Sequence, residues 1–183
     1  MINKDYLKYD ALGSITDVLN KIGSVQLRSF MDEKSFKKIV KEASKIRMKR
    51  LYFPLKESYL FAKFNNGGLL KELEAFFSLL VGKRLKVKSS YLISFKHKDY
   101  FLLNDIKKES NGFKAIFELT ERWDDKSGGY ACFLKNGKEF VRIFPIKNSL
   151  TIVKTSKDMQ SFVKYVNHNA GKRKRIFVEM TLV

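Results

Sequence analysis

The stretch LKVKSSYLISFKH, residues 85–97, has the side-chain alternation of a half-buried β-strand. Apolar or aromatic side chains fall on odd positions, namely Leu85, Val87, Tyr91, Ile93 and Phe95, and lysines or serines occupy several of the even ones. Successive side chains of a strand point to opposite faces of a sheet, so this pattern buries one face and leaves the other in water. The stretch therefore predicts a strand with one face toward a core.

Short strands are expected from this stretch to the end of the sequence. Each predicted segment is rich in β-branched or aromatic residues and is bounded by Asn, Gly, Lys or Asp. The segments are 100–103, 113–119, 130–134, 140–144, 150–153, 162–166 and 176–182. Together with the first strand they make about eight, which is typical of a β-sandwich or a jelly roll.

Two amphipathic helices are expected before the strands. Asp32 is a good N-cap for a helix that has Phe36, Ile39, Val40 and Ala43 on one face. A second helix is expected after the Asn-Gly turn at 65–68, and it should end at Gly82. The order predicts an α+β, mainly β protein in which N-terminal helices pack on one sheet of a jelly roll. We expect one domain over 26–183, preceded by an N-terminal extension over 1–25.

Composition and charge restrict the class of partner. The chain has 183 residues, 44% of them hydrophobic, which suits one domain with a real core and excludes disorder. It carries 37 Lys and Arg against 19 Asp and Glu, a net charge of +18. Such an excess is typical of proteins that work beside polyanions, so a nucleic acid or another polyanionic assembly is an expected partner.

Cysteine usage and hydropathy indicate the compartment. Cys132 is the only cysteine, which excludes a disulfide framework and a Cys/His zinc site and favours a reducing compartment. There is no apolar run of 18 residues, and the N-terminal stretch has no hydrophobic core of a signal peptide. We therefore expect a cytoplasmic protein that does not enter a membrane.

Few residues suggest catalysis. The phosphate-binding motifs G-x-x-x-x-G-K-[ST] and G-x-G-x-x-G and the hydrolase motif G-x-S-x-G are absent. The only histidines are His97 and His168, and His97 forms an H-x-D with Asp99. If this motif lies in a strand, both side chains share one side, and His168 would complete a two-His-one-carboxylate set for Fe(II). Taken alone, the motif is read more simply as an exposed polar pair ending a lysine-rich strand.

Four segments occur in an order that resembles a known family. They read DYFLLNDI (99–106), FELTERWDDKSGGYACF (117–133), PIKNSL (145–150) and SFVKYVNHNAGKRKR (161–175). This order is similar to that of the 2-oxoglutarate/Fe(II) oxygenases of the prolyl hydroxylase-like branch, and most of all to the prolyl dihydroxylase type. The helical stretches 29–43 and 69–86 also resemble helices of that family. The resemblance implies a double-stranded β-helix, which is a jelly roll, with Fe(II) and 2-oxoglutarate as cofactors and a protein prolyl side chain as substrate.

The resemblance implies two alternative sets of site residues. In both, Arg175 matches the arginine that pairs with the distal carboxylate of 2-oxoglutarate, and Arg173 competes for that role. If DYFLL is matched to the family motif, the three metal positions fall on Asn104, Ile106 and Ser161, a degenerate set that binds iron poorly. The alternative set is the literal triad His97, Asp99 and His168. Neither alternative identifies a further catalytic residue.

Three functions are therefore consistent with the sequence. The first is an oxygenase-fold protein with lost or altered iron ligation, a pseudoenzyme or binding protein that acts through its basic surface. The second is an active 2-oxoglutarate-dependent protein hydroxylase that uses His97, Asp99, His168 and Arg175. The third is a basic nucleic-acid-binding module in which Phe and Tyr stack on bases. The expected partner is a protein substrate or a polyanionic assembly such as a ribosome or a nucleic acid, and the sequence does not indicate an oligomeric state.

Overall fold

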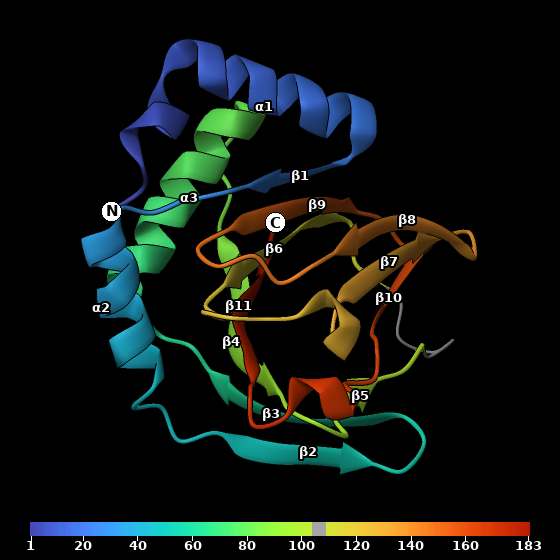
Figure 1. Ribbon diagram of the computed structural model, residues 1–183. Coiled ribbons are helices and arrows are strands. Elements are labelled where there is room, and N and C mark those ends of the chain that lie inside the picture. Colours follow the sequence, from blue (N-terminus) through green and yellow to red (C-terminus); the bar gives the residue numbers. More distant parts are fainter. Residues whose placement is uncertain (104–108) are drawn as a thin grey trace.

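The computed structural model describes residues 1–103 and 109–183, and Figure 1 shows its arrangement. The helical elements are η1 (Lys4–Leu7), α1 (Tyr9–Ile22), α2 (Glu33–Ala43), α3 (Gly67–Val81), η2 (Asp125–Ser127) and η3 (His168–Ala170). The strands are β1 (Ser24–Leu27), β2 (Lys49–Phe53), β3 (Glu57–Lys63), β4 (Val87–Phe95), β5 (Tyr100–Phe101), β6 (Gly112–Glu118), β7 (Ala131–Lys135), β8 (Lys138–Ile143), β9 (Leu150–Thr155), β10 (Met159–Val163) and β11 (Arg175–Leu182).

Within the described residues the strands form one antiparallel sheet that is almost closed on itself. Its order is β1-β9-β6-β11-β4-β3-β5-β10-β7-β8, and β2 pairs with β3 off this path. The two ends approach each other, because the side-chain amide of Gln26 on β1 donates to the carbonyl of Phe144, 3.3 Å away, just after β8. Helices α1, α2 and α3 lie along one side of this barrel in Figure 1. The predicted mainly β jelly roll with helices packed on one sheet is confirmed.

The sheet separates two hydrophobic clusters, and β11 contributes to both. Val178, Met180 and Leu182 belong to the cluster that includes the buried faces of the helices. Phe177, on the opposite face of the strand, belongs to the cluster inside the barrel. Successive side chains of β11 therefore point alternately into the outer core, which the helices cover, and into the barrel interior.

Local signals placed two of the helices correctly. Asp32 caps α2 by accepting a hydrogen bond from the Ser35 backbone N–H at 2.8 Å. Helix α3 ends at Gly82, which adopts a φ of 68° in the left-handed region that favours glycine. Helix α1 was not predicted; its Ile15 and Leu19 are buried in the outer core, so much of residues 1–25 packs on the domain. No helix of the described ranges is long and apolar enough to cross a membrane.

The hairpin of β2 and β3 was also missed by the sequence patterns. Four of the five residues of β2 are exposed, so the strand has no apolar face and no alternation to detect. Tyr52 and Phe53 keep 61% and 51% of their surfaces in solvent. Tertiary pairing with β3, and not a local hydrophobic pattern, makes this segment a strand.

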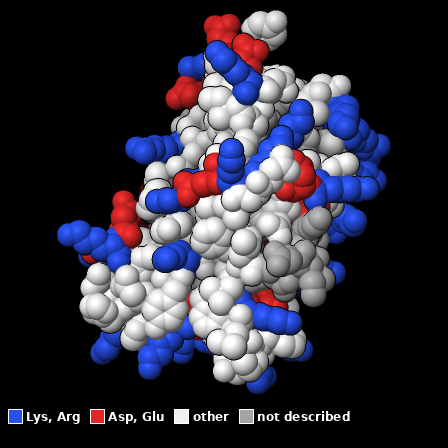
Figure 2. All heavy atoms as spheres, turned by 90° about the vertical axis from the view of Figure 1, so that its right-hand side faces the viewer, with Lys and Arg blue, Asp and Glu red and all other residues white. Residues whose placement is uncertain are grey.

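Basic side chains are dispersed over the outside of the barrel. Figure 2 shows Lys and Arg at many points of one face, most of them along its margin, with Asp and Glu at fewer places. The short basic run 172–174, just before β11, is exposed. The net charge of +18 is therefore spread over the surface instead of forming one compact patch on this face.

The PIKNSL segment owes its shape to Asn148. This residue has a φ of 54°, and its side chain bonds both polar groups of the Met31 backbone, accepting from N–H at 3.0 Å and donating to C=O at 2.8 Å. Its own carbonyl accepts from the Phe30 backbone N–H at 2.8 Å. Asn148 therefore fixes the chain just before α2 to the start of β9.

We expect Asn148→Ala to lower the free energy of unfolding by roughly 2–4 kcal/mol, because the buried N–H and C=O of Met31 both lose their partner. Chemical denaturation measures this change. Asn136→Ala is the matched control, since Asn136 also has a positive φ of 50° but is exposed. That variant should lose only about 1 kcal/mol. Equal losses in the two variants would show that backbone strain, and not the bonds to Met31, explains the effect.

Candidate functional site

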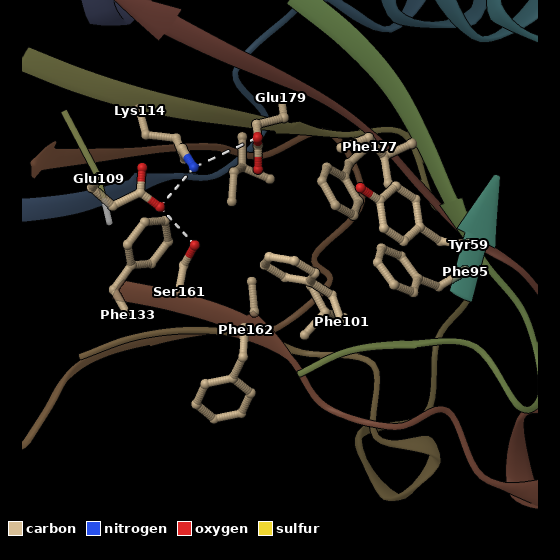
Figure 3. Close-up of a pocket in the computed structure, with 14 residues that line it drawn as sticks. Tyr59, Phe95, Phe101, Glu109, Lys114, Phe133, Ser161, Phe162, Phe177 and Glu179 are labelled. Atoms are coloured by element: carbon tan, nitrogen blue, oxygen red, sulfur yellow. Dashed lines mark hydrogen bonds and ion pairs between the residues drawn. The ribbon is translucent and has the colours of Figure 1, made fainter. Parts of the chain in front are cut away.

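The inner faces of the strands enclose a cavity of about 130 Å³, shown in Figure 3. Side chains from β3, β4, β5, β6, β7, β10 and β11 line it, so its wall comes from most of the barrel. One end of the cavity carries charged and polar groups, and the rest is largely aromatic. This division makes it the leading candidate for a functional site in the described part of the chain.

Lys114 lies at the polar end between two glutamates. Its Nζ is 2.8 Å from Glu109 Oε1 and 3.6 Å from Glu179 Oε1, and the Ser161 hydroxyl donates to the same Glu109 oxygen at 2.6 Å. Only 12% of the Lys114 side chain is exposed. Burial alone would lower the pKa of Lys114, but the charges of Glu179 and Glu109 outweigh it and raise the pKa above its ordinary value. The ammonium therefore stays charged inside the barrel.

Aromatic rings form the opposite wall of the cavity. Tyr59, Phe95 and Phe177 stack in a row, with ring centroids 5.2 Å and 6.1 Å apart, and Phe101 meets Tyr59 edge-on. Phe133 lies beside the polar end, where Lys114 Nζ is 5.6 Å from the centre of its ring. Burial raises the pKa of the Tyr59 hydroxyl, and the charges of Glu57 and Glu179 raise it further. Tyr59 thus remains a neutral phenol at the cavity wall.

A second buried ion pair lies beyond Phe177. Arg175 has none of its surface exposed, and its Nε and Nη2 both donate to Glu118 Oε2, at 3.1 Å and 2.9 Å. Its Nη1 donates to the Gly129 carbonyl at 2.6 Å, and its guanidinium lies 4.4 Å from the centre of the Phe177 ring. The other Glu118 oxygen accepts from the Thr120 hydroxyl at 2.5 Å. The guanidinium is therefore engaged by groups of the protein itself.

The turn that brings the Gly129 carbonyl to Arg175 requires glycine. Gly128 and Gly129 have φ values of 70° and 69°. A Cβ on Gly128 would lie 2.2 Å from the Tyr165 carbonyl oxygen, and one on Gly129 would lie 2.8 Å from the ring of Trp123. The glycine pair thus lets the chain pass close to two neighbours before it enters β7.

Of the three degenerate metal positions, the structure describes only Ser161. Ser161 on β10 lines the cavity and bonds Glu109. Asn104 and Ile106 lie outside the described residues. Arg175 is on the inner face of β11, although the groups that line the cavity on that strand are Phe177 and Glu179. Arg173 is in the exposed connection before β11, where its Nη2 donates to the Asn169 carbonyl at 2.5 Å.

The literal triad is not brought together. The literal triad requires His97 and Asp99 to lie in a strand, but they lie in the turn between β4 and β5, because Lys98 between them adopts a φ of 75°. Asp99 is 3% exposed and pairs with Arg50, whose Nη1 is 2.5 Å from Asp99 Oδ1. His168 begins η3 and is exposed. Among the described residues no three His, Cys, Asp or Glu side chains form a group able to hold a metal ion.

Sequence patterns missed the charged residues that the cavity contains. Lys114 occupies an inward position of β6, next to Phe113 and Ala115 on the outer face, and Glu179 lies between Val178 and Met180 in the same way. A charged residue inside a strongly apolar strand was the available signal. The sequence could not indicate that Lys114 and Glu179 face each other, since they lie on different strands.

The described residues do not fit the cofactors that the family resemblance implies. The two carboxylates near Ser161 are already the counter-ions of an ammonium, which would repel Fe(II) from the same oxygens. The guanidinium expected to bind 2-oxoglutarate pairs with Glu118 and is covered by Phe177 on one side. We therefore derive no chemical step through iron or 2-oxoglutarate in this barrel.

The Glu118–Arg175 pair gives a stability prediction. Glu118→Gln or Arg175→Met alone should lower the free energy of unfolding by roughly 3–5 kcal/mol, because each leaves a buried charge without its partner. The double variant should lose clearly less than the sum of the two, as measured by chemical denaturation.

The exposed pair of Glu139 and Arg142 serves as the control, since about half of each side chain is in solvent. Glu139→Gln should cost about 1 kcal/mol or less. Strictly additive effects at Glu118 and Arg175 would show that the two charges are not coupled.

Known proteins were compared with the chain. No family model matches the sequence. A segment of 90 residues is 26% identical to prolyl 3-hydroxylase OGFOD1 of Xenopus laevis, covering 46% of this chain and 18% of that protein. The alignment therefore spans less than a fifth of that relative.

Solved structures are similar over nearly the whole chain. A prolyl 4-hydroxylase from Pseudomonas putida superposes with a TM-score of 0.73 at 12% identity, covering 93% of this chain and 97% of its own. A 2OG-Fe(II) oxygenase family oxidoreductase from Burkholderia pseudomallei gives 0.72 at 12% identity, covering 96% and 92%. The Trichoplax adhaerens prolyl hydroxylase in complex with a hypoxia-inducible-factor fragment gives 0.71 at 12% identity, covering 94% and 89%. This chain has the double-stranded β-helix fold of the prolyl hydroxylase-like 2-oxoglutarate/Fe(II) oxygenases.

Proposed function

We propose that this protein uses the oxygenase fold as a binding scaffold, without iron and 2-oxoglutarate chemistry in its barrel, and that its basic surface binds a polyanion. The observation that carries the proposal is that the charged groups inside the barrel pair with one another. Lys114 pairs with Glu109 and Glu179, and Arg175 pairs with Glu118. Because these side chains bind one another, a cofactor could reach them only by displacing a partner.

The energetics of buried charges support this interpretation. Separating a buried ion pair leaves an uncompensated charge, at a cost of about 3–5 kcal/mol. To bind the distal carboxylate of 2-oxoglutarate through Arg175, the protein would have to displace Glu118, which is 1% exposed and also bonded to Thr120. Binding a divalent cation at Glu109 and Glu179 would likewise require Lys114 to move. Each cofactor would therefore have to compete with a bond that the fold already makes.

The outer surface supports the second half of the proposal. The net charge of +18 is dispersed around the barrel, and the exposed run 172–174 carries three adjacent positive charges. Dispersed lysines and arginines suit the regular charge of a phosphate backbone, to which each contributes a largely independent contact. A nucleic acid, free or within a ribosome, is the partner that this distribution fits best.

The first test measures cofactor binding. Under anaerobic conditions, we expect no saturable binding of Fe(II) to the purified protein by calorimetry, with or without 2-oxoglutarate, and no succinate on admission of oxygen. Lys114→Met provides a gain-of-function comparison, because Glu109 and Glu179 then lose their counter-ion. Mn(II) should raise the melting temperature of that variant more than that of the wild type. Stoichiometric Fe(II) in the wild type, with succinate formed from 2-oxoglutarate, would overturn the proposal.

The second test measures nucleic-acid binding against salt. If the surface neutralises three or more phosphates, the affinity for single-stranded RNA should fall by about tenfold or more between 50 mM and 200 mM salt. Lys172→Glu/Lys174→Glu should weaken binding, and Lys172→Gln/Lys174→Gln should weaken it less. Fluorescence anisotropy measures both effects. Absent or salt-insensitive binding would contradict the role of the surface.

A further inference from the structure

We infer that the barrel cavity binds a small organic cation, an alkylammonium or N-methylated ammonium group of about the size of choline. This binding activity is separate from the surface function proposed above, and it rests on that proposal only in requiring that no metal occupies the cavity. Charge, ring arrangement and size support it independently.

The first support is an excess of negative charge around the cavity. Among the described residues, Glu109 and Glu179 face one ammonium, that of Lys114, so the polar end carries one more negative than positive charge. Arg175 does not cancel this excess, because its charge is matched by Glu118. A cation entering the cavity would therefore be attracted, while an anion would meet the carboxylates of Glu109 and Glu179.

The second support is the aromatic wall. Rings attract cations that approach their faces within about 6 Å, and small quaternary ammonium ions are bound in cages of this kind. The faces of Phe95 and Phe177 are largely covered by the ring stack and by Arg175. The cavity therefore offers chiefly Tyr59, Phe101 and Phe133 to a further cation. The protein already uses one of them in this way, because the Lys114 ammonium lies 5.6 Å from the centre of the Phe133 ring. In Figure 3 the rings of Tyr59 and Phe101 face the polar cluster across the cavity, and Phe133 lies beside that cluster.

The third support is the size and accessibility of the cavity. Its volume is about 130 Å³, somewhat less than an engineered cavity of roughly 150 Å³ that admits benzene. An ion of choline size suits such a space, and a nucleotide or a dicarboxylate with a metal ion would need more room. The cavity communicates with solvent, since 29% of the Glu179 side chain is exposed and Tyr59, Phe101 and Ser161 are only half-buried.

The decisive experiment compares two probes of nearly the same shape. Choline and its neutral isostere 3,3-dimethyl-1-butanol differ chiefly in the positive charge. In EDTA and at constant ionic strength, choline should bind in calorimetry and raise the melting temperature, and the isostere should do neither. A peptide with one trimethyllysine is a second probe, and tighter binding than choline would indicate that the natural ammonium group is carried by a polypeptide.

Variants locate the binding in the cavity. Glu179→Gln removes one cavity carboxylate and should weaken choline binding by about tenfold, while Glu121→Gln, at an exposed position, should not. Phe101→Leu keeps an apolar side chain but loses the ring, so it should weaken binding by roughly two- to thirtyfold. Its control is Phe53→Leu on the exposed face of β2.

Two results would overturn the inference, namely no binding of any ammonium probe, or equal binding of choline and its isostere. Either result would leave the proposed function standing if Fe(II) also fails to bind. Binding of Fe(II) by the wild type would instead overturn the proposed function, whatever choline does. The two proposals can therefore fail separately.

Discussion

The position of the C-terminal strand constrains both the fold and the site. Strand β11 lies between β4 and β6 and pairs with both along most of its length. Residues 175–182 therefore lie at the centre of the sheet. One face of β11 packs into the core shared with the helices, and the other carries Arg175, Phe177 and Glu179 along the barrel interior. Any change in the register of β11 would exchange these two faces.

Those three inward residues also organise the electrostatics of the interior. Arg175 and Glu179 are held at opposite sides of Phe177 by charged partners on β6, namely Glu118 and Lys114. Strands β6 and β11 thus form two ion pairs. In one the positive charge is on β11 and the negative charge on β6, and in the other the two charges are exchanged. In a low-dielectric interior such pairs must be satisfied together, because either charge alone would be expensive to bury. The charges of the barrel interior therefore compensate one another, and a cofactor could bind to them only by replacing a partner.

Local patterns were sufficient for elements that are determined locally. The capping of α2 by Asp32 and the end of α3 at Gly82 each depend on residues close in sequence. The half-buried pattern predicted for 85–97 was wrong, because β4 is central in the sheet and buries both faces, with Leu92 in the outer core and Ile93 in the barrel interior. The β2–β3 hairpin and the Lys114 cluster depend on pairing between distant segments, which no local period records. The H-x-D of His97 and Asp99 is a case in which a local pattern suggested a structure that the chain does not adopt. Its spacing suits a strand, but the left-handed Lys98 turns the chain there, and Asp99 pairs with Arg50 instead.

Among the described residues, the outside of the protein has an excess of positive charge and the polar end of the cavity an excess of negative charge, and solvent affects the two differently. The surface lysines and arginines are exposed, so salt screens them over about 8–10 Å at physiological ionic strength. The carboxylates at the cavity are close together and largely removed from water, so salt screens them much less. An anionic partner on the surface and a cation in the cavity therefore would not compete for the same groups. Moderate salt would release the first while largely sparing the second, which makes ionic strength a means of observing one activity without the other.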